Sequence, residues 1–266
     1  MTSEFSFAAL LSTLLVSLLI VVPYSAVAGD ANSPASDFPA TDLIIFSADG
    51  NHVIGHGRYT ISRTDDTEIL RGENQYLDGE HDVELERLKL GVGAQAPTLV
   101  SYEHSFFNAN GSPQIVDSLD VKHGSASCKS YTEGNFEDHQ SNLAVPADTY
   151  AGATQIMFVV VGLRQGAHEI KFHAFNCMPR PRIIAVEALA GADRVRWSMY
   201  PGELVKLEIQ PDFGWFGILV APFVRKMDAW FDPRDNWNYV GGLYDRFYKG
   251  PHILTVRAFQ PFRQRD

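Results

Sequence analysis

The chain has 266 residues, of which 45% are hydrophobic and 20% are charged, so it is long enough to bury a sizeable core. Its formal net charge of −10 disfavours a nucleic-acid partner, because phosphate groups would be repelled by such a surface. Walker loops, glycine-rich dinucleotide motifs and the GxSxG motif of hydrolases are absent from the sequence, so no catalytic signature stands out.

The chain begins with an apolar segment that we do not expect to belong to the fold. Residues 5–28, FSFAALLSTLLVSLLIVVPYSAVA, carry no charge and end in the small-x-small pattern of a cleavage site, which predicts a signal peptide over residues 1–28. The start contains Glu4 but no basic residue, and the apolar run is long enough to span a bilayer, so a retained N-terminal anchor is the alternative. Either way the body is exported, to the periplasm or the exterior.

A flexible lead-in over residues 29–41 is followed by a series of turn signals. These dipeptides separate runs of alternating polar and apolar residues, and they are Asp49-Gly50, Asp65-Asp66, Asp78-Gly79, Asn110-Gly111 and His123-Gly124. Asn-Gly and Asp-Gly supply the positive φ that tight hairpin turns require. The pattern predicts an antiparallel meander over residues 43–132.

If each dipeptide is a two-residue turn, it fixes which side chains face one another across its hairpin. The expected pairs are Phe46 with Val53, Ile61 with Leu70, Asn74 with Val83, Phe106 with Ile115, Tyr102 with Leu119, and Leu119 with Cys128. Most of these pairs bring apolar residues together on one face, and a slip of one residue would turn every side chain to the other face.

The same arithmetic places three polar residues in a row on this apolar face: His104, Asp117 and Ser130. The carboxylate would lie in the middle, whereas a hydrolase triad needs the imidazole there, so acyl chemistry is not expected. The row is either a satisfied polar cluster that fixes the register or a patch that orients the polar end of a ligand. Arg87 adds a positive charge to this face if the register continues past the change of apolar parity at Leu88.

The segment from Pro146 to Gly166 changes period. Its apolar and small residues at helical spacing, Tyr150, Ala153, Thr154, Met157, Phe158 and Val161, predict a helix. Asp148 or Thr149 is the expected N-cap, and Gly166 is the expected stop. The β-branched run leaves a strand over 156–161 as the alternative.

Strands are expected again over residues 168–176, 182–190, 194–200, 203–209, 226–232, 237–244 and 252–259. No linker divides this body, so residues 42–266 are predicted to form a single β-rich domain. The aromatic rings of the last three strands should be mainly core, with Trp230 or Tyr239 as candidates to reach a cavity.

An apolar segment over residues 213–223, which includes Trp215, lies between two expected strands. Connecting segments are usually polar, so this one is expected to be core, to cover a cavity, or to touch a membrane or a partner.

Cys128 and Cys177 are the two cysteines of the chain. In an exported protein such a pair favours a disulfide, and two buried thiols are the alternative. The nine histidines show no carboxylate partner at metal-site spacing, so we expect no metal and no cofactor.

The order of elements resembles the LolA/VioE-like group of exported β proteins, which includes DUF3108-type domains of unknown function. The resemblance lies in the meander of 43–132, in VPADTYAGATQIMFVVVGLRQG as a helix entering the concavity, and in KMDAWFDPRDNWNYVGG as a late hairpin. It implies a mainly β fold, a broad curved antiparallel meander or unclosed barrel wrapped around one helix, whose concave face holds an apolar molecule.

The sequence therefore favours an exported binding or carrier protein for an apolar or lipid-like small molecule, with His104, Asp117, Ser130, Trp215 and Trp230 as candidate ligand-binding residues. One alternative is a cofactor-free enzyme that uses His104 and Asp117 as an acid–base pair. Another is a structural protein of the envelope.

Overall fold

The computed structural model describes residues 40–64, 66–91, 95–132, 135–197, 200, 202–214, 226–247 and 250–258. The expected signal peptide or anchor lies outside these residues, as do Trp215 and most of the apolar segment around it. Within these ranges, no helix is long and apolar enough to cross a membrane.

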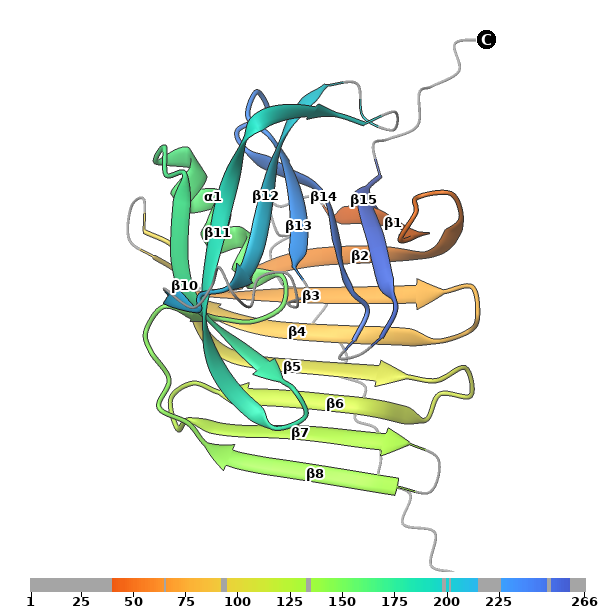
Figure 1. Ribbon diagram of the computed structural model, residues 1–266. Coiled ribbons are helices and arrows are strands. Elements are labelled where there is room, and N and C mark those ends of the chain that lie inside the picture. Colours follow the sequence, from red (N-terminus) through yellow and green to blue (C-terminus); the bar gives the residue numbers. More distant parts are fainter. Residues whose placement is uncertain are drawn as a thin grey trace, which may run out of the picture. The chain divides into compact units, whose positions relative to one another are not determined.

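Eight consecutive strands form the N-terminal half of a large sheet (Figure 1). They are β1 (Thr41–Ser47), β2 (Val53–Thr64), β3 (Thr67–Tyr76), β4 (His81–Lys89), β5 (Thr98–Phe107), β6 (Pro113–Asp120), β7 (Ser125–Thr132) and β8 (Asn135–Asn142). Each is antiparallel to the next, so the predicted meander is confirmed. The last of them, β8, was not predicted.

Among its described residues, the C-terminal half has one helix and seven strands. These are β9 (Thr149–Tyr150), α1 (Thr154–Arg164), β10 (Glu169–Cys177), β11 (Pro181–Arg196), β12 (Glu203–Pro211), β13 (Met227–Asp232), β14 (Asn238–Asp245) and β15 (His252–Arg257). The strands expected over 182–190 and 194–200 are joined in β11, whose pairing with β12 is irregular between Ala190 and Arg194.

The two halves join through their first and last strands. The strand order is β8-β7-β6-β5-β4-β3-β2-β1-β15-β14-β13-β12-β11-β10-β9, and β1 pairs with β15 so that Ile45 lies opposite Thr255. The ends of this order, β8 and β9, do not pair with each other, so the described strands form one sheet that is not closed into a barrel. The predicted fold class, a mainly β, unclosed antiparallel sheet with one helix, is confirmed.

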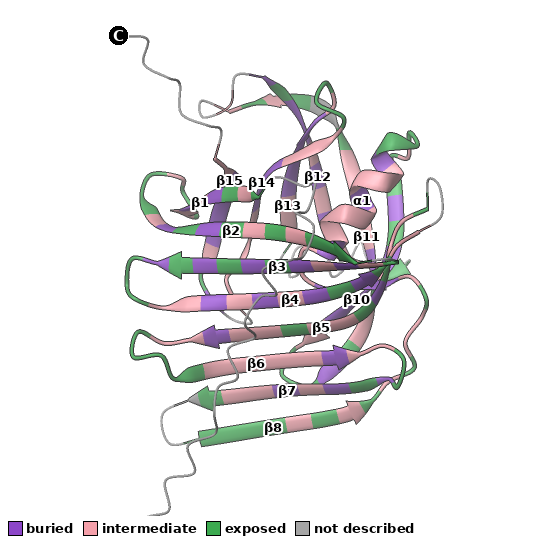
Figure 2. Ribbon diagram, turned by 180° about the vertical axis from the view of Figure 1, so that it is seen from behind, coloured by how far each residue is buried: buried purple, intermediate pink, exposed green. Residues whose placement is uncertain are grey.

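The sheet curls so that strands far apart in its order approach one another. β9 contacts β5, and β11 contacts β7 and β8. A buried cluster spans this approach, with Leu88, Leu119 and Cys128 on one side and Phe175 on the other. Figure 2 shows the consequence along β3 and β4, where buried residues alternate with intermediate or exposed ones because one face of each strand points into the interior.

Helix α1 packs in this interior and begins in a way that the sequence did not predict. Val159 and Leu163 are buried in a cluster with side chains of β10 to β13. Met157 packs against the other cluster, the one that contains Leu88 and Phe175. Ala153, not Asp148 or Thr149, occupies the N-cap position, and its methyl side chain cannot accept a hydrogen bond. The helix ends before Gly166, as expected.

Several predicted registers are confirmed: Phe46 with Val53, Ile61 with Leu70, Phe106 with Ile115, Tyr102 with Leu119, and His104 with Asp117. The hairpin at Asp78-Gly79 is different. The backbone N–H of Tyr76 bonds to the carbonyl of Glu80, so the loop has three residues and ends at Gly79 with a φ of 88°. Asn74 therefore faces Asp82, not Val83.

Candidate functional site

The three-residue loop turns the acidic side of β4 toward the interior. Asp82, Glu84 and Glu86, which we call the acidic row, are all buried, and Glu86 is completely inaccessible to solvent. Because residues two apart in a strand share a face, the three carboxyl groups follow one another along the face of β4 that points into the interior. A buried carboxylate is costly without hydrogen-bond partners, so each of the three must be satisfied by its neighbours.

Glu86 is satisfied by the start of α1. Its carboxylate accepts a hydrogen bond from the backbone N–H of Ala153 at 2.8 Å and from that of Thr154 at 3.2 and 3.3 Å. These are two of the N–H groups that a helix leaves without an intrahelical partner. A carboxylate from the sheet thus replaces the N-cap side chain that the sequence was expected to supply. Burial, together with the neighbouring Glu84, raises the pKa of Glu86 well above its usual range.

Glu84 lies between the helix entry and a tyrosine. The hydroxyl of Tyr59 donates to its Oε2 at 3.2 Å. On the other side its Oε1 lies against Gly152, where any side chain would collide with the carboxyl group. Burial raises the pKa of Glu84, an effect that His104 opposes.

Asp82 is held by neutral donors. The Asn74 amide donates to Oδ1 and the Tyr76 hydroxyl donates to Oδ2, each at 2.9 Å. The Nε2 atom of His104 is 3.9 Å from Oδ1, and both side chains are largely buried. Burial raises the pKa of Asp82, although His104 opposes this rise.

His104 lies in the strand next to the acidic row and has a carboxylate on each side. Its cross-strand partner on β4 is Glu84, and its partner on β6 is Asp117, as the sequence predicted. Direct cross-strand partners have Cβ atoms about 4.5–5.5 Å apart, so these side chains are neighbours. Burial raises the pKa of Asp117 to about 6, while His104 opposes the rise.

Ser130 does not lie beside Asp117, as the predicted row of His104, Asp117 and Ser130 requires. Four residues, Val121 to Gly124, separate β6 from β7, so the register shifts by two from the prediction: Asp117 faces Cys128, and Ser130 faces Ile115. The expected pairing of Leu119 with Cys128 is wrong for the same reason, since Leu119 faces Ala126. A shift by two keeps each side chain on its face, so Cys128 still points into the core.

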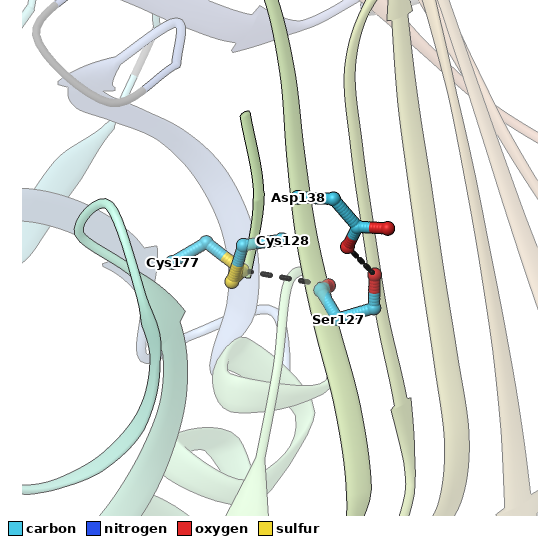
Figure 3. Close-up of a disulfide and its surroundings, with 4 residues drawn as sticks. All are labelled: Ser127, Cys128, Asp138 and Cys177. Carbon is cyan, nitrogen blue, oxygen red and sulfur yellow. Dashed lines mark hydrogen bonds between the residues drawn. A yellow bond between two sulfur atoms is a disulfide. The ribbon is translucent and has the colours of Figure 1, made fainter. Parts of the chain in front are cut away.

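Cys128 forms the predicted disulfide with Cys177, 49 residues away, and the two Cα atoms are 5.7 Å apart. In Figure 3 the disulfide lies beside the backbone of Ser127, whose carbonyl oxygen is 3.8 Å from Sγ of Cys177. Asp117 has a carboxylate oxygen close to both sulfur atoms. Because both thiols are consumed in the disulfide, these three residues do not offer a set of metal ligands in this state.

The structure also locates two other residues that the sequence analysis singled out. Arg87 is exposed, because the residues of β4 that share its parity point away from the acidic row. The pairing of β4 with β5 is irregular at this point, since Arg87 faces Ser101 while Leu88 faces Leu99. Trp230 is 8% exposed and packs in a cluster with Leu204 and Val240.

A cavity of about 360 Å³ lies beside α1. Its walls are mainly apolar and come from the helix, from β10 and from the segment before β5: Gln95, Ala96, Phe158, Val161, Gly162, Gln165, Ala167, Glu169 and Ile170. The helical residues are three or four positions apart, so they form one face of α1. Of the candidate binding residues that the structure describes, His104, Asp117, Ser130 and Trp230, none is among those that line it.

No model of a known protein family matches the chain, and no curated protein matches it. Among solved structures, the chain is similar to a β-barrel-like protein of the domain of unknown function DUF1849 from Brucella abortus. The similarity covers 82% of this chain and 94% of that chain, with a TM-score of 0.41 and 11% identity. Membership in the LolA/VioE-like group stays a prediction.

The site therefore offers two kinds of chemistry. The acidic row and Asp117 supply carboxyl groups whose pKa values are raised by burial, next to the imidazole of His104. The cavity beside α1 supplies an apolar surface with a few polar groups. The sequence predicted the pairing of His104 with Asp117. It did not predict that Glu84 and Glu86 are buried, because a two-residue turn at Asp78-Gly79 would place both side chains on the exposed face.

Proposed function

We propose that this chain is an exported binding protein that takes a small apolar ligand into the cavity beside α1. The observation that carries the proposal is the composition of the walls: Phe158, Val161 and Ile170 face a space of about 360 Å³. Ligand sites in proteins begin at about 300 Å³, so the space suits a short acyl chain or a single aromatic ring system. Export is supported by the disulfide, since such bonds persist in oxidising compartments.

The polar side chains of the cavity suggest the other end of the ligand. Gln95, Gln165 and Glu169 line the same space as the apolar residues. An amphipathic molecule would bury its apolar part against α1 and present its polar group to these side chains. A polar headgroup is therefore part of the proposal.

The experiment is titration of the purified protein with a solvatochromic apolar dye, followed by displacement with a lipid extract. Val161→Trp adds a large ring to the cavity wall and should reduce dye affinity at least tenfold. Leu77→Trp is the matched control, because Leu77 is 72% exposed and is not part of this wall. Dye binding that is unchanged in Val161→Trp, or absent from the folded wild type, would contradict the proposal.

A second candidate function is enzymatic. It is favoured by the pair His104 and Asp117, in which a carboxyl group with a pKa of about 6 lies beside an imidazole in the interior. His104→Gln keeps a polar side chain of similar reach and should leave the unfolding transition close to that of the wild type while abolishing any turnover. If His104→Gln instead unfolds the protein, the pair is structural.

A further inference from the structure

A second cavity, of about 420 Å³, lies where β11 ends and β12 begins. The described residues that line it are Arg196, Trp197, Tyr200, Gly202, Glu203 and Arg234. No described residue lines both this cavity and the cavity beside α1. Its walls combine two aromatic rings with two guanidinium groups and a carboxylate, a different chemistry from that of the first cavity.

One buried carboxylate organises this cavity. The side chain of Asp232 is only 4% exposed. It accepts hydrogen bonds from the hydroxyl of Tyr200 at 2.5 Å and from Nε and Nη2 of Arg234 at 3.2 and 3.1 Å. Hydrogen bonds from Arg234 and Tyr200 lower the pKa of Asp232 to about 2, so it is ionised at any physiological pH. Asp232 therefore holds two of the lining side chains in fixed positions.

The backbone and a second indole complete the walls. Any side chain at Gly202 would collide with the Arg234 guanidinium and with the Tyr200 ring, so both groups lie directly over this glycine. Trp197 packs against Trp230, with ring centroids 4.4 Å apart, and also against Gly241. The Trp197 ring is thus supported by the core and is also part of the cavity wall.

The charges around the cavity cancel in pairs. Arg196 is paired with Glu203 at 2.7 Å, and Arg234 with Asp232 at 3.1 Å. A phosphate or carboxylate ligand would have to compete with these two carboxylates for the guanidinium groups. A neutral ligand with several hydroxyls would instead bond to the two guanidinium groups and to the Glu203 carboxylate, because guanidinium groups donate and carboxylates accept.

We propose that this cavity binds a neutral sugar unit of a glycan. A pyranose ring has apolar C–H faces, which suit the indole and phenol rings of Trp197 and Tyr200. Its hydroxyls lie around the ring edge, where paired Arg and carboxylate groups can donate and accept hydrogen bonds. The preformed network around Asp232 reduces the ordering cost of binding. This site is independent of the function proposed for the cavity beside α1.

The test measures binding of maltotriose, cellotriose and N,N′-diacetylchitobiose by isothermal titration calorimetry. At least one should bind the wild type with a Kd in the micromolar to low millimolar range, and Arg234→Ala should weaken that binding at least tenfold. Tyr200→Phe, which removes only a hydroxyl, should weaken it several-fold. Arg71→Ala is the control, because Arg71 is an exposed arginine paired with Glu73 on β3.

The outcomes separate this site from the other. Saccharide binding that persists in Val161→Trp but is lost in Arg234→Ala supports the proposal. Binding lost in Val161→Trp and kept in Arg234→Ala would move the sugar to the first cavity and overturn it. Failure of all three saccharides to bind, or binding of inorganic phosphate alone, would overturn it as well.

Discussion

Glu86 and Thr154 are 68 residues apart in the chain, and the carboxylate of the first accepts a hydrogen bond from the backbone of the second. The bond connects the N-terminal meander to the start of α1. Because Glu86 is completely buried, its carboxylate has exchanged water for these backbone donors. The position of the helix in the interior therefore depends on a residue of β4.

Glu86→Ala should destabilise the protein by roughly 2–4 kcal/mol, since it leaves the N–H groups of Ala153 and Thr154 without this buried acceptor. Glu84→Gln is the comparison, because it removes a neighbouring negative charge and keeps an acceptor for Tyr59. It should be neutral or stabilising. Urea unfolding followed by circular dichroism measures both, and equal destabilisation by the two variants would contradict the assignment.

Gly152→Ala should be much more harmful than Gly166→Ala. Both glycines flank α1 and both have positive φ, 46° and 81°, so each substitution carries the same kind of backbone cost. Only Gly152 is in contact with another group, the Glu84 carboxyl, whereas a methyl group at Gly166 would meet no heavy atom within 4 Å. We expect about 1 kcal/mol for Gly166→Ala and several for Gly152→Ala by thermal unfolding. If the two variants lose similar free energies of unfolding, the segment around Gly152 can move away from Glu84 at little cost.

Stability should depend on pH through Asp117. An unfolded aspartate titrates near pH 3.9, whereas Asp117 in the fold has a pKa of about 6. Between these values the folded protein keeps a proton that the unfolded chain has lost, so the free energy of unfolding falls as the pH rises from about 4 to about 6. The fall attributable to this residue is roughly 2–3 kcal/mol. Asp117→Asn should remove this part of the slope in urea titrations between pH 4 and 7.

The control for this experiment is Asp120→Asn. Hydrogen bonds from His123 lower the pKa of Asp120, and the side chain is exposed, so its replacement should leave the slope between pH 4 and 6 unchanged. If Asp117→Asn has the wild-type slope, the carboxyl group titrates normally.

Loss of the disulfide should destabilise the protein by about 4 kcal/mol, since the bond closes a loop of 49 residues in the unfolded chain. The double substitution Cys128→Ser and Cys177→Ser, compared with wild type in urea with and without dithiothreitol, measures this. Reductant should lower the midpoint of the wild type only. A midpoint that is the same in all samples would contradict a structural role for the bond.

The sequence predicted the class of fold because alternating patterns and turn dipeptides are local signals. It predicted the His104–Asp117 pair although the loop at Asn110-Gly111 also has three residues, because an irregularity between Phe106 and Phe107 restores the assumed register. At Asp78-Gly79 the loop is one residue longer, and two- and three-residue loops both use Asp-Gly. One residue is enough to reverse the faces of β4.

Other features depend on contacts that no local pattern carries. The carboxylate that caps α1 belongs to Glu86, on a strand distant in sequence, so the prediction that Asp148 or Thr149 is the N-cap was wrong. Strand β8 was missed because it lies at the sheet edge and most of its residues are exposed, which removes the apolar alternation. For Glu86 the sequence does contain a signal, because the apolar residue Leu88 is two positions further along and must lie on the same face of the strand. In the structure Leu88 is fully buried.

The pairing of β1 with β15 has a consequence for biogenesis. During synthesis β1 leaves the ribosome first among the described strands, and its partner leaves last, so the edge of the N-terminal meander stays open until β15 has been made. An open strand edge is a template for aggregation, and non-local pairings form slowly. The nascent protein should therefore need a chaperone to protect this edge until β15 arrives.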